Sequence, residues 1–345
     1  MNKVILASIF FLSLNAENFR DPRLPDSGMP LCLTDIESGI SQSARFQLRD
    51  GFGFGFNVNF AELSLFQDNY EVGFLSNSQK NPVGGVYKFQ TKYAPGVEVG
   101  FVFNLPYDKW NLSGNYFWYS VYQHFMKNNS GSNYFYSPIF SIPTFDNLLD
   151  SLDAKRDIYL NSCDLYLSRP FYSGRNLSFE PKLGLKSVIL KQKFHLESVV
   201  HGGTWTEQTA ETKSTSWGIG PKLGFLSNFM LGGGVSIFSD ISTSILYSTL
   251  SSSSLNYSKT NTGGSFAKNK GYNLLEPVFD SSIGLTFGGY VLKQSFYVNM
   301  KAAYNFSAYF AQNVSRALVA TATNRQAAQS NLYTQGGSIG FNFQF

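Results

Sequence analysis

The chain has 345 residues and a net charge of +4, and its charged fraction of 14% lies far below the roughly 25% typical of soluble domains. Aromatic residues reach 17%, with 33 Phe and 20 Tyr, and 31 Gly are spread among them. This composition excludes a disordered chain, a charge-rich cytosolic enzyme and a nucleic-acid partner, whereas it fits a transmembrane β-barrel, whose lipid-facing and lumen-facing residues alternate.

The N-terminus has the pattern of a secretory signal peptide. Lys3 precedes the apolar residues 4–14, a run shorter than the ~18 residues that suggest a spanning helix. The alternative is a short buried core segment. We expect residues 1–16 to be removed after Ala16 and the protein to be exported to the bacterial outer membrane.

Residues 17–52 lack the pattern of barrel strands. Thr34 and Glu37 have the spacing of a helix cap, so this segment is either a small periplasmic or plugging element or a disordered tail. An oxidising compartment permits a disulfide, and the sequence leaves open whether Cys32 and Cys163 pair with each other, pair between chains or stay free. Their spacing does not resemble a metal site, and we expect no cofactor.

Residues 53–345 have the period-two alternation of long strands. The clearest strand is predicted over residues 87–103, with aromatic and apolar residues on one face and charged residues on the other. Near residues 60–62 the outward set shifts to Leu63 and Leu65, which predicts a β-bulge or a break. Over residues 158–167 the two faces are nearly equally apolar, so inward and outward cannot be distinguished there.

Short and long connections alternate along the chain. Short ones are predicted near residues 106–109, 171–175, 228–231 and 288–292, and long polar ones near residues 76–84, 127–153, 197–213, 251–271 and 312–331. Outer-membrane barrels have short periplasmic turns and longer external loops. The order predicts an antiparallel barrel of about ten strands with both termini in the periplasm, or twelve if residues 111–125 or a long loop hide another hairpin.

The final strand and the aromatic residues near strand ends suggest partners in the envelope. The last strand resembles the signal read by the barrel assembly machinery; the alternative is an ordinary edge strand. Its outward residues are Ile339, Phe341, Phe343 and Phe345. A girdle against outer-membrane lipid is expected at both rims, where amphipathic rings are favourable. The girdle candidates are Tyr107, Trp110, Tyr172, Trp217, Tyr247 and Tyr290.

Charged residues fall on the faces expected to line the lumen. These candidates are Lys88, Lys92, Glu98, Glu180, Lys182, Lys186, Lys222, Asp240, Glu276, Asp280 and Lys301. Their signs are mixed, so either a narrow aqueous pathway with weak selectivity or a salt-bridged network that closes the lumen would follow. Barrels of ~8 strands have filled interiors and those of 16–18 strands leave a channel, and ten is nearer the closed end.

A hydrolase would need a histidine and carboxylate partners near the outer rim. His124, His195 and His201 lie towards predicted external ends, and one loop carries several Asp residues, but no short motif ties a serine to them. We expect no enzymatic activity.

Several runs resemble the pore-forming major-outer-membrane-protein-like group of Legionella and similar proteins of chlamydia-related bacteria. They cover residues 95–101, 108–112, 116–119, 164–169 and 183–185 with Gln192. The chain departs from the family at Glu98 and Asn111, so no charge selectivity is carried over. The resemblance implies a pore-forming outer-membrane protein.

The sequence therefore predicts a porin-like passive conduit for small solutes or ions. The alternative is a structural or adhesive barrel whose external loops contact a host or another envelope protein. The solute and the oligomeric state are not determined by the sequence.

Overall fold

The computed structural model describes residues 53–68, 71–76, 82–105, 110–128, 134–137, 148–173, 176–200, 207–259, 262–269, 272–291, 296–312 and 331–345. The predicted signal peptide, the segment over residues 17–52 and His201 lie outside these ranges. Within them, no helix is long and apolar enough to cross a membrane.

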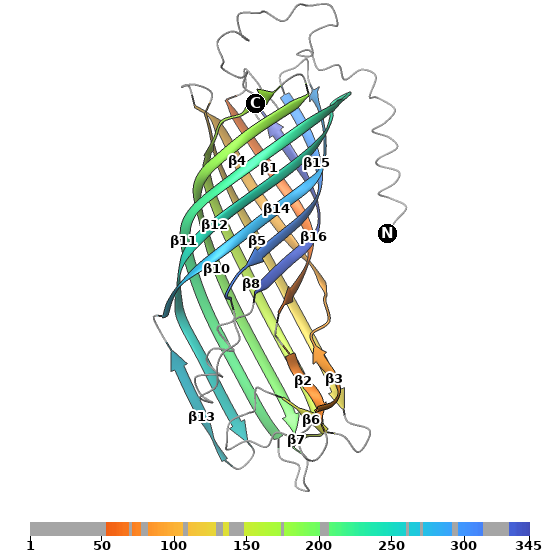
Figure 1. The fold of residues 1–345 in the computed structure, drawn as a ribbon, viewed down its shortest axis with the longest axis vertical. Coiled ribbons are helices and arrows are strands. Elements are labelled where there is room, and N and C mark those ends of the chain that lie inside the picture. The colour runs from red at the N-terminus through yellow and green to blue at the C-terminus, as the bar shows by residue number, and fades with distance from the viewer. Residues whose placement is uncertain are drawn as a thin grey trace, which may run out of the picture.

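Ten long antiparallel strands close into a barrel in the described part of the chain (Figure 1). They are β1 (Phe54–Gln67), β4 (Tyr93–Asn104), β5 (Asn111–Asn128), β8 (Ser151–Ser168), β10 (Leu177–Val199), β11 (Glu207–Gly232), β12 (Val235–Lys259), β14 (Tyr272–Val291), β15 (Phe296–Tyr309) and β16 (Leu332–Gln344). The barrel closes where β1 pairs with β16 and where β11 pairs with β12. This confirms the predicted fold class and strand number.

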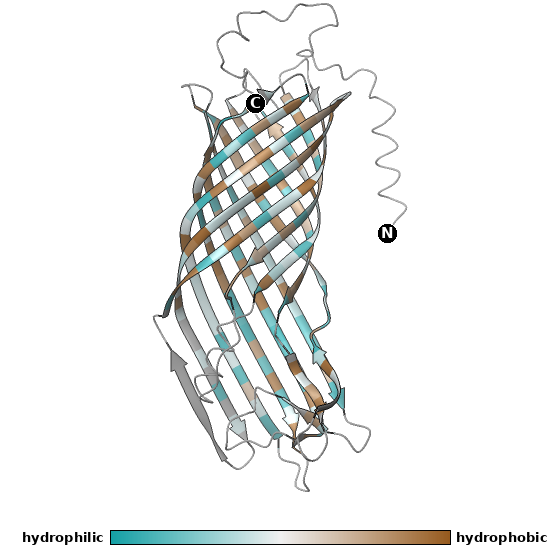
Figure 2. Cartoon of the chain, viewed as in Figure 1, coloured by the Kyte–Doolittle hydropathy of each residue, from teal (hydrophilic) through white to brown (hydrophobic). Residues whose placement is uncertain are grey.

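The alternation of side chains explains why these residues form barrel strands. On β10, Lys182 and Lys186 are buried and face the interior, whereas Leu183, Leu185 and Ile189 are exposed on the outside. Figure 2 shows the same change between polar and apolar residues along the other strands. Such a strand is stable only where one face meets lipid and the other meets a polar or packed interior.

Several strands are much longer than a bilayer requires. β10, β11 and β12 have 23, 26 and 25 residues, whereas roughly 9–11 tilted residues cross a membrane. The prediction of loops over residues 197–213 and 251–271 was therefore wrong, since β10 and β11 pair from Leu177 to Val199 and β13 (Thr262–Asn269) pairs with β12. Polar residues occupy both faces of these segments because no lipid covers them, and this polarity had been interpreted as loop.

A small second sheet lies at the end where the long strands project (Figure 1). It consists of β2 (Glu71–Ser76), β3 (Pro82–Lys88), β6 (Tyr134–Tyr136) and β7 (Leu148–Leu149). The predicted single strand over residues 87–103 was wrong: β3 ends at Lys88, β4 begins at Tyr93, and the two belong to different sheets. The alternation continues across the break because Tyr87 and Phe89 both pack against an apolar cluster.

The predicted bulge near residues 60–62 was also wrong. The register of β1 with β4 and with β16 continues through these residues without a shift. Leu63 and Leu65 point into the barrel, where they are 4% and 0% exposed. The apparent change of face arose because the interior itself becomes apolar at this level.

The opposite end of the barrel has the tight connections. Between β11 and β12 the chain turns at Gly232, Gly233 and Gly234, whose φ angles are 102°, 61° and 80°. L side chains rarely adopt such angles, so glycine permits a turn this short. The alternation of short and long connections assigns this end to the periplasm.

The outward faces locate the bilayer on the barrel. On β10 the outward residues of the apolar band are Leu177, Phe179, Pro181, Leu183, Leu185, Ser187 and Ile189, and the next outward residue is Lys191. On β11 the band ends at Trp217, and Lys213 lies two outward positions further from the membrane. A band of this size matches the roughly 9–11 residues of a membrane-spanning strand.

Cys163 offers a direct test of this placement. It is free and exposed on the outward face of β8, opposite Ser187 of β10 within the apolar band, whereas Cys32 lies outside the described residues. A nitroxide on Cys163 of a Cys32→Ser variant in vesicles should be relaxed strongly by oxygen in lipid and weakly by an aqueous nickel chelate. A nitroxide on Lys193→Cys in a variant lacking both native cysteines should give the reverse. Equal relaxation at both positions would contradict the placement.

Candidate functional site

The interior of the barrel is the candidate functional site, and along β10 it changes character in four layers. From the periplasmic end, the inward residues are first Ser178, Glu180, Lys182, Gly184 and Lys186, then Val188 and Leu190, then Gln192, then Phe194 and Leu196. On β8 the corresponding inward residues are Asp164, then Leu160 and Ile158, then Arg156 in place of an amide, then Ala154 and Leu152. The lumen therefore alternates between charged, apolar, amide and apolar levels.

The periplasmic layer is an ion-paired cavity of about 290 Å³. Lys186 on β10 lies between two carboxylates, 3.0 Å from Asp280 and 3.4 Å from Asp164. Since β11 and β12 separate β10 from β14 in the sheet, the pair with Asp280 reaches across the interior. The other ion pairs of the cavity are Lys182 with Asp240 at 2.7 Å and Lys222 with Asp164 at 2.6 Å.

Lys301 lines the same cavity, but the partner of its ammonium group is an aromatic ring. Its ammonium lies 4.4 Å from the ring centroid of Phe238, a cation–π contact. Glu98 also lines the cavity and accepts a hydrogen bond from Asn59 at 3.0 Å. Each charge in this layer has a partner inside the protein, which is how buried charges are tolerated.

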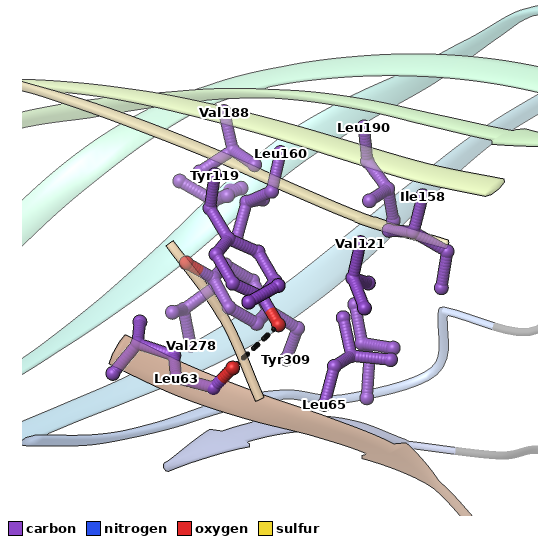
Figure 3. Close-up of a cluster of buried hydrophobic side chains, with 13 residues drawn as sticks. Leu63, Leu65, Tyr119, Val121, Ile158, Leu160, Val188, Leu190, Val278 and Tyr309 are labelled. Atoms are coloured by element: carbon purple, nitrogen blue, oxygen red, sulfur yellow. Dashed lines mark hydrogen bonds between the residues drawn. The ribbon is translucent and has the colours of Figure 1, made fainter. Parts of the chain in front are cut away.

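Above the cavity, an apolar belt fills the lumen. Its thirteen residues contact one another, are 9% exposed or less, and come from nine of the ten barrel strands: Leu63, Leu65, Ala94, Tyr119, Val121, Ile158, Leu160, Val188, Leu190, Leu246, Val278, Tyr309 and Leu332. Figure 3 shows side chains of opposite walls meeting in the interior. The Tyr119 hydroxyl donates a hydrogen bond to the Leu63 carbonyl at 2.9 Å, so its polar tip is satisfied. Six of the thirteen members have no exposed surface, and none of the others exceeds 9%.

A layer of amides lies above the belt. Arg156 donates hydrogen bonds to Gln67 and, at 3.5 Å, to Gln192. Gln192 donates in turn to the backbone carbonyl of Gln312 at 3.3 Å, after β15 on the far side of the barrel, and Gln123 donates to the Leu65 carbonyl at 3.2 Å. These side chains are buried, so the amide layer ties opposite walls together.

The second sheet closes the outer level. Val72, Phe135 and Leu149 of this sheet pack against inward residues of the barrel wall, among them Leu152 of β8 and Phe194 of β10. All five are 2% exposed or less. The projecting part of the barrel is thus filled by protein and not by solvent.

The structure places most predicted lumen residues in the interior. Seven of them line the cavity: Glu98, Lys182, Lys186, Lys222, Asp240, Asp280 and Lys301. Glu180 is buried on the inward face of β10, and Glu276 is buried opposite the belt residue Leu246, where it accepts a hydrogen bond from Ser248 at 2.6 Å. Lys88 and Lys92 are exposed outside the cavity, because the strand expected to carry them is interrupted at residues 89–92.

Three of the predicted girdle residues and the outward residues of the last strand are exposed on the barrel. Trp110, Trp217 and Tyr247 are 38%, 45% and 52% exposed. Tyr172 lies on β9 (Phe171–Ser173) and Tyr290 on β14, whereas Tyr107 lies outside the described residues. The outward residues of the last strand are all exposed: Ile339, Phe341, Phe343 and Phe345.

Two of the three histidines lie on the outward face above the apolar band. His124 is 2.7 Å from Asp153, and His195 is 2.8 Å from Glu197. The hydrogen bond with His195 holds the pKa of Glu197 below its ordinary value. Among the described residues, no group of three or more His, Cys, Asp or Glu could hold a metal ion.

Three interior residues escaped the sequence interpretation. Asp164 and Arg156 lie in or beside the stretch whose two faces were equally apolar, and Tyr119 lies in a segment considered as a hidden hairpin. Asp164 is the only charged residue within residues 158–167, and this could have indicated its inward position. Neither the belt nor the amide layer could be predicted from the sequence, because their residues come from strands far apart in the chain.

Comparison with solved structures finds barrels of the outer membrane. The protease OmpT of Escherichia coli is 11% identical over 85% of this chain and 97% of its own, with a TM-score of 0.43. The toluene transporter TodX of Pseudomonas putida is 10% identical over 88% and 92%, with a TM-score of 0.31. A major outer membrane protein of Thermus thermophilus is 8% identical over 85% and 99%, with a TM-score of 0.31. At such identities the likeness carries no information on activity.

The comparison with protein families is decisive for identity. No curated protein matches the chain. The model of the family described as Legionella pneumophila major outer membrane protein precursor matches residues 53–345, which is the whole barrel. This chain is a bacterial outer membrane β-barrel and belongs to the Legionella major outer membrane protein family.

Proposed function

We propose that this barrel acts at the cell surface, as a structural or adhesive protein that works through its outer extension, and that its lumen is closed to diffusion. The observation that carries the proposal is the apolar belt, whose members from nine strands are 9% exposed or less. An ion entering the belt would lose its hydration and meet mostly apolar side chains, at a cost of many kcal/mol. The proposal requires no catalytic step.

The length of the strands supports the same conclusion. β11 has 26 residues, or about 88 Å along the strand at ~3.4 Å per residue, against a hydrocarbon core of ~30 Å. The excess projects beyond the apolar band and is packed around the second sheet. The paired outer ends of these strands lie far from the lipid, and a passive conduit does not need strands of this length.

The porin-like conduit is the second candidate, and the ion-paired cavity favours it. Lys182, Lys186 and Lys222 face polar and charged groups around a space of about 290 Å³, as in an aqueous vestibule. This candidate requires a second conformation in which the belt parts.

Conductance in a planar bilayer decides between the two. The refolded mature protein should give no reproducible single-channel steps. A Leu65→Ser/Leu160→Ser variant should let water enter the belt, because it adds two hydroxyls there, and it should conduct only if the amide layer and the second sheet above the belt do not block the lumen as well. The matched control is Leu165→Ser/Leu183→Ser, which makes the same change on the lipid-facing surface and should stay silent.

Heat-modifiable migration on a gel must show that every variant is folded. Reproducible steps from the unmodified protein would overturn the proposal and establish the porin-like function. Silence of the belt variant would mean that another level of the lumen also blocks it.

A further inference from the structure

A basic patch lies on the outside of the barrel, directly above the apolar band. Lys191 and Lys193 are exposed on β10, and Lys213 is exposed on β11. Lys191 is the next outward residue after Ile189, the last apolar residue of the band on that strand. These three lysines therefore lie at the level where lipid headgroups surround the barrel.

The lysines are placed close together by the register of the strands. Lys193 lies directly opposite Lys213, and Lys191 is the neighbouring outward residue on the same strand. Like charges directly opposite each other destabilise a sheet unless a counter-charge lies between them. Such an arrangement is relieved by an anion bound from outside.

Acidic residues of the chain do not neutralise all three lysines. Lys213 contacts Glu211 at 2.7 Å. Asp157 lies opposite Lys193 on the other side, but within the described residues neither Lys191 nor Lys193 forms an ion pair. Both ammonium groups remain available to a ligand.

Aromatic rings border the patch beside Lys191 and on its membrane side. Tyr159 lies opposite Lys191 on β8 and is 37% exposed, and Trp217 on β11 is 45% exposed. Amphipathic rings at this level pack against the junction of acyl chains and headgroups. A lipid seated here would place its chains on the apolar band and its anionic headgroup among the lysines.

We infer that Lys191, Lys193 and Lys213 form a binding site for the phosphate groups of an outer-leaflet lipid. Phosphate oxygens accept charge-assisted hydrogen bonds from several ammonium groups at once. The long lysine side chains let the ammonium groups reach towards the headgroup while their methylenes lie on the apolar surface. This site is independent of whether the lumen conducts.

The experiment uses bisphosphorylated lipid A as the probe. The full mature protein is reconstituted in phosphatidylcholine nanodiscs with lipid A, and bound lipid is counted by native mass spectrometry. The triple variant Lys191→Gln/Lys193→Gln/Lys213→Gln should lose roughly 100-fold in lipid A affinity, at about fivefold for each lysine near an anionic surface. The corresponding triple arginine variant should retain binding.

A Lys92→Gln/Lys127→Gln variant is the matched control, since it removes exposed lysines outside the patch and should bind lipid A normally. Dephosphorylated lipid A should bind the unmodified protein as weakly as bisphosphorylated lipid A binds the triple glutamine variant. Undiminished binding of lipid A by a heat-modifiable triple glutamine variant would overturn the inference. Equal binding of the phosphorylated and dephosphorylated lipids would also overturn it, by showing that acyl chains alone are recognised.

Discussion

Replacing Lys186 by Met should lower the free energy of unfolding by about 3–5 kcal/mol, the range measured when one partner of a buried ion pair is removed. The Lys186 side chain is 4% exposed and lies 3.0 Å from Asp280. Asp164 keeps Lys222 as a partner at 2.6 Å, whereas Asp280 would lose its ion pair at 3.0 Å and keep a hydrogen bond with Ser307. Urea unfolding in lipid vesicles, followed by tryptophan fluorescence, measures the change.

Two further variants separate this effect from a general loss of charge. Lys186→Met/Asp280→Asn removes the orphaned carboxylate and should recover a large part of the stability. Lys213→Met breaks an exposed ion pair whose lysine side chain is 52% exposed, and it should cost about 0–1 kcal/mol. Equal losses for Lys186→Met and Lys213→Met would show that the cavity is well hydrated and that its ion pairs are screened by water as at the surface.

Truncating Tyr119 to Ala should cost about 3–5 kcal/mol, as large-to-small changes of buried aromatic residues do. Tyr119 is 0% exposed and lies within the belt, where neighbouring strands restrict how far the site can collapse. Tyr119→Phe keeps the ring and loses only the hydrogen bond to Leu63, so it should cost about 1 kcal/mol. The same urea titration gives both values.

Tyr122→Ala provides the matched control on the same strand. This tyrosine is 50% exposed, and its truncation should change stability by about 0.5 kcal/mol or less. If Tyr119→Ala were as mild as Tyr122→Ala, the belt would be loosely packed and an open lumen would become the better explanation.

The fold could be predicted from the order of residues because every strand of a membrane barrel alternates between residues that face lipid and residues that face the interior. Leu183 and Lys182 must face different solvents, so the period of two appears in the sequence itself. Ten strands followed from the alternation of short and long connections. The outward residues of the last strand, from Ile339 to Phe345, were recognisable for the same reason.

The predicted strand ends were wrong where the two faces of a strand do not meet different solvents. Beyond the lipid, no apolar solvent imposes alternation, so the paired residues 207–213 of β11 were mistaken for loop. At Leu63 and Leu65 the interior is apolar, and the same alternation then indicated the wrong face. In both cases the strand itself is regular, and the error arose from what surrounds it: no lipid at residues 207–213, and an apolar interior at Leu63 and Leu65.

The order of residues predicts the class of protein, the strand number and which charged residues of β10 and β11 point inward. The partners of those residues follow from the closed barrel. Lys186 meets Asp280 from a strand three places away in the sheet, and the belt joins residues of nine strands. The proposed closure of the lumen depends on side chains that meet across the barrel, and the period of two along a strand does not show which side chains meet.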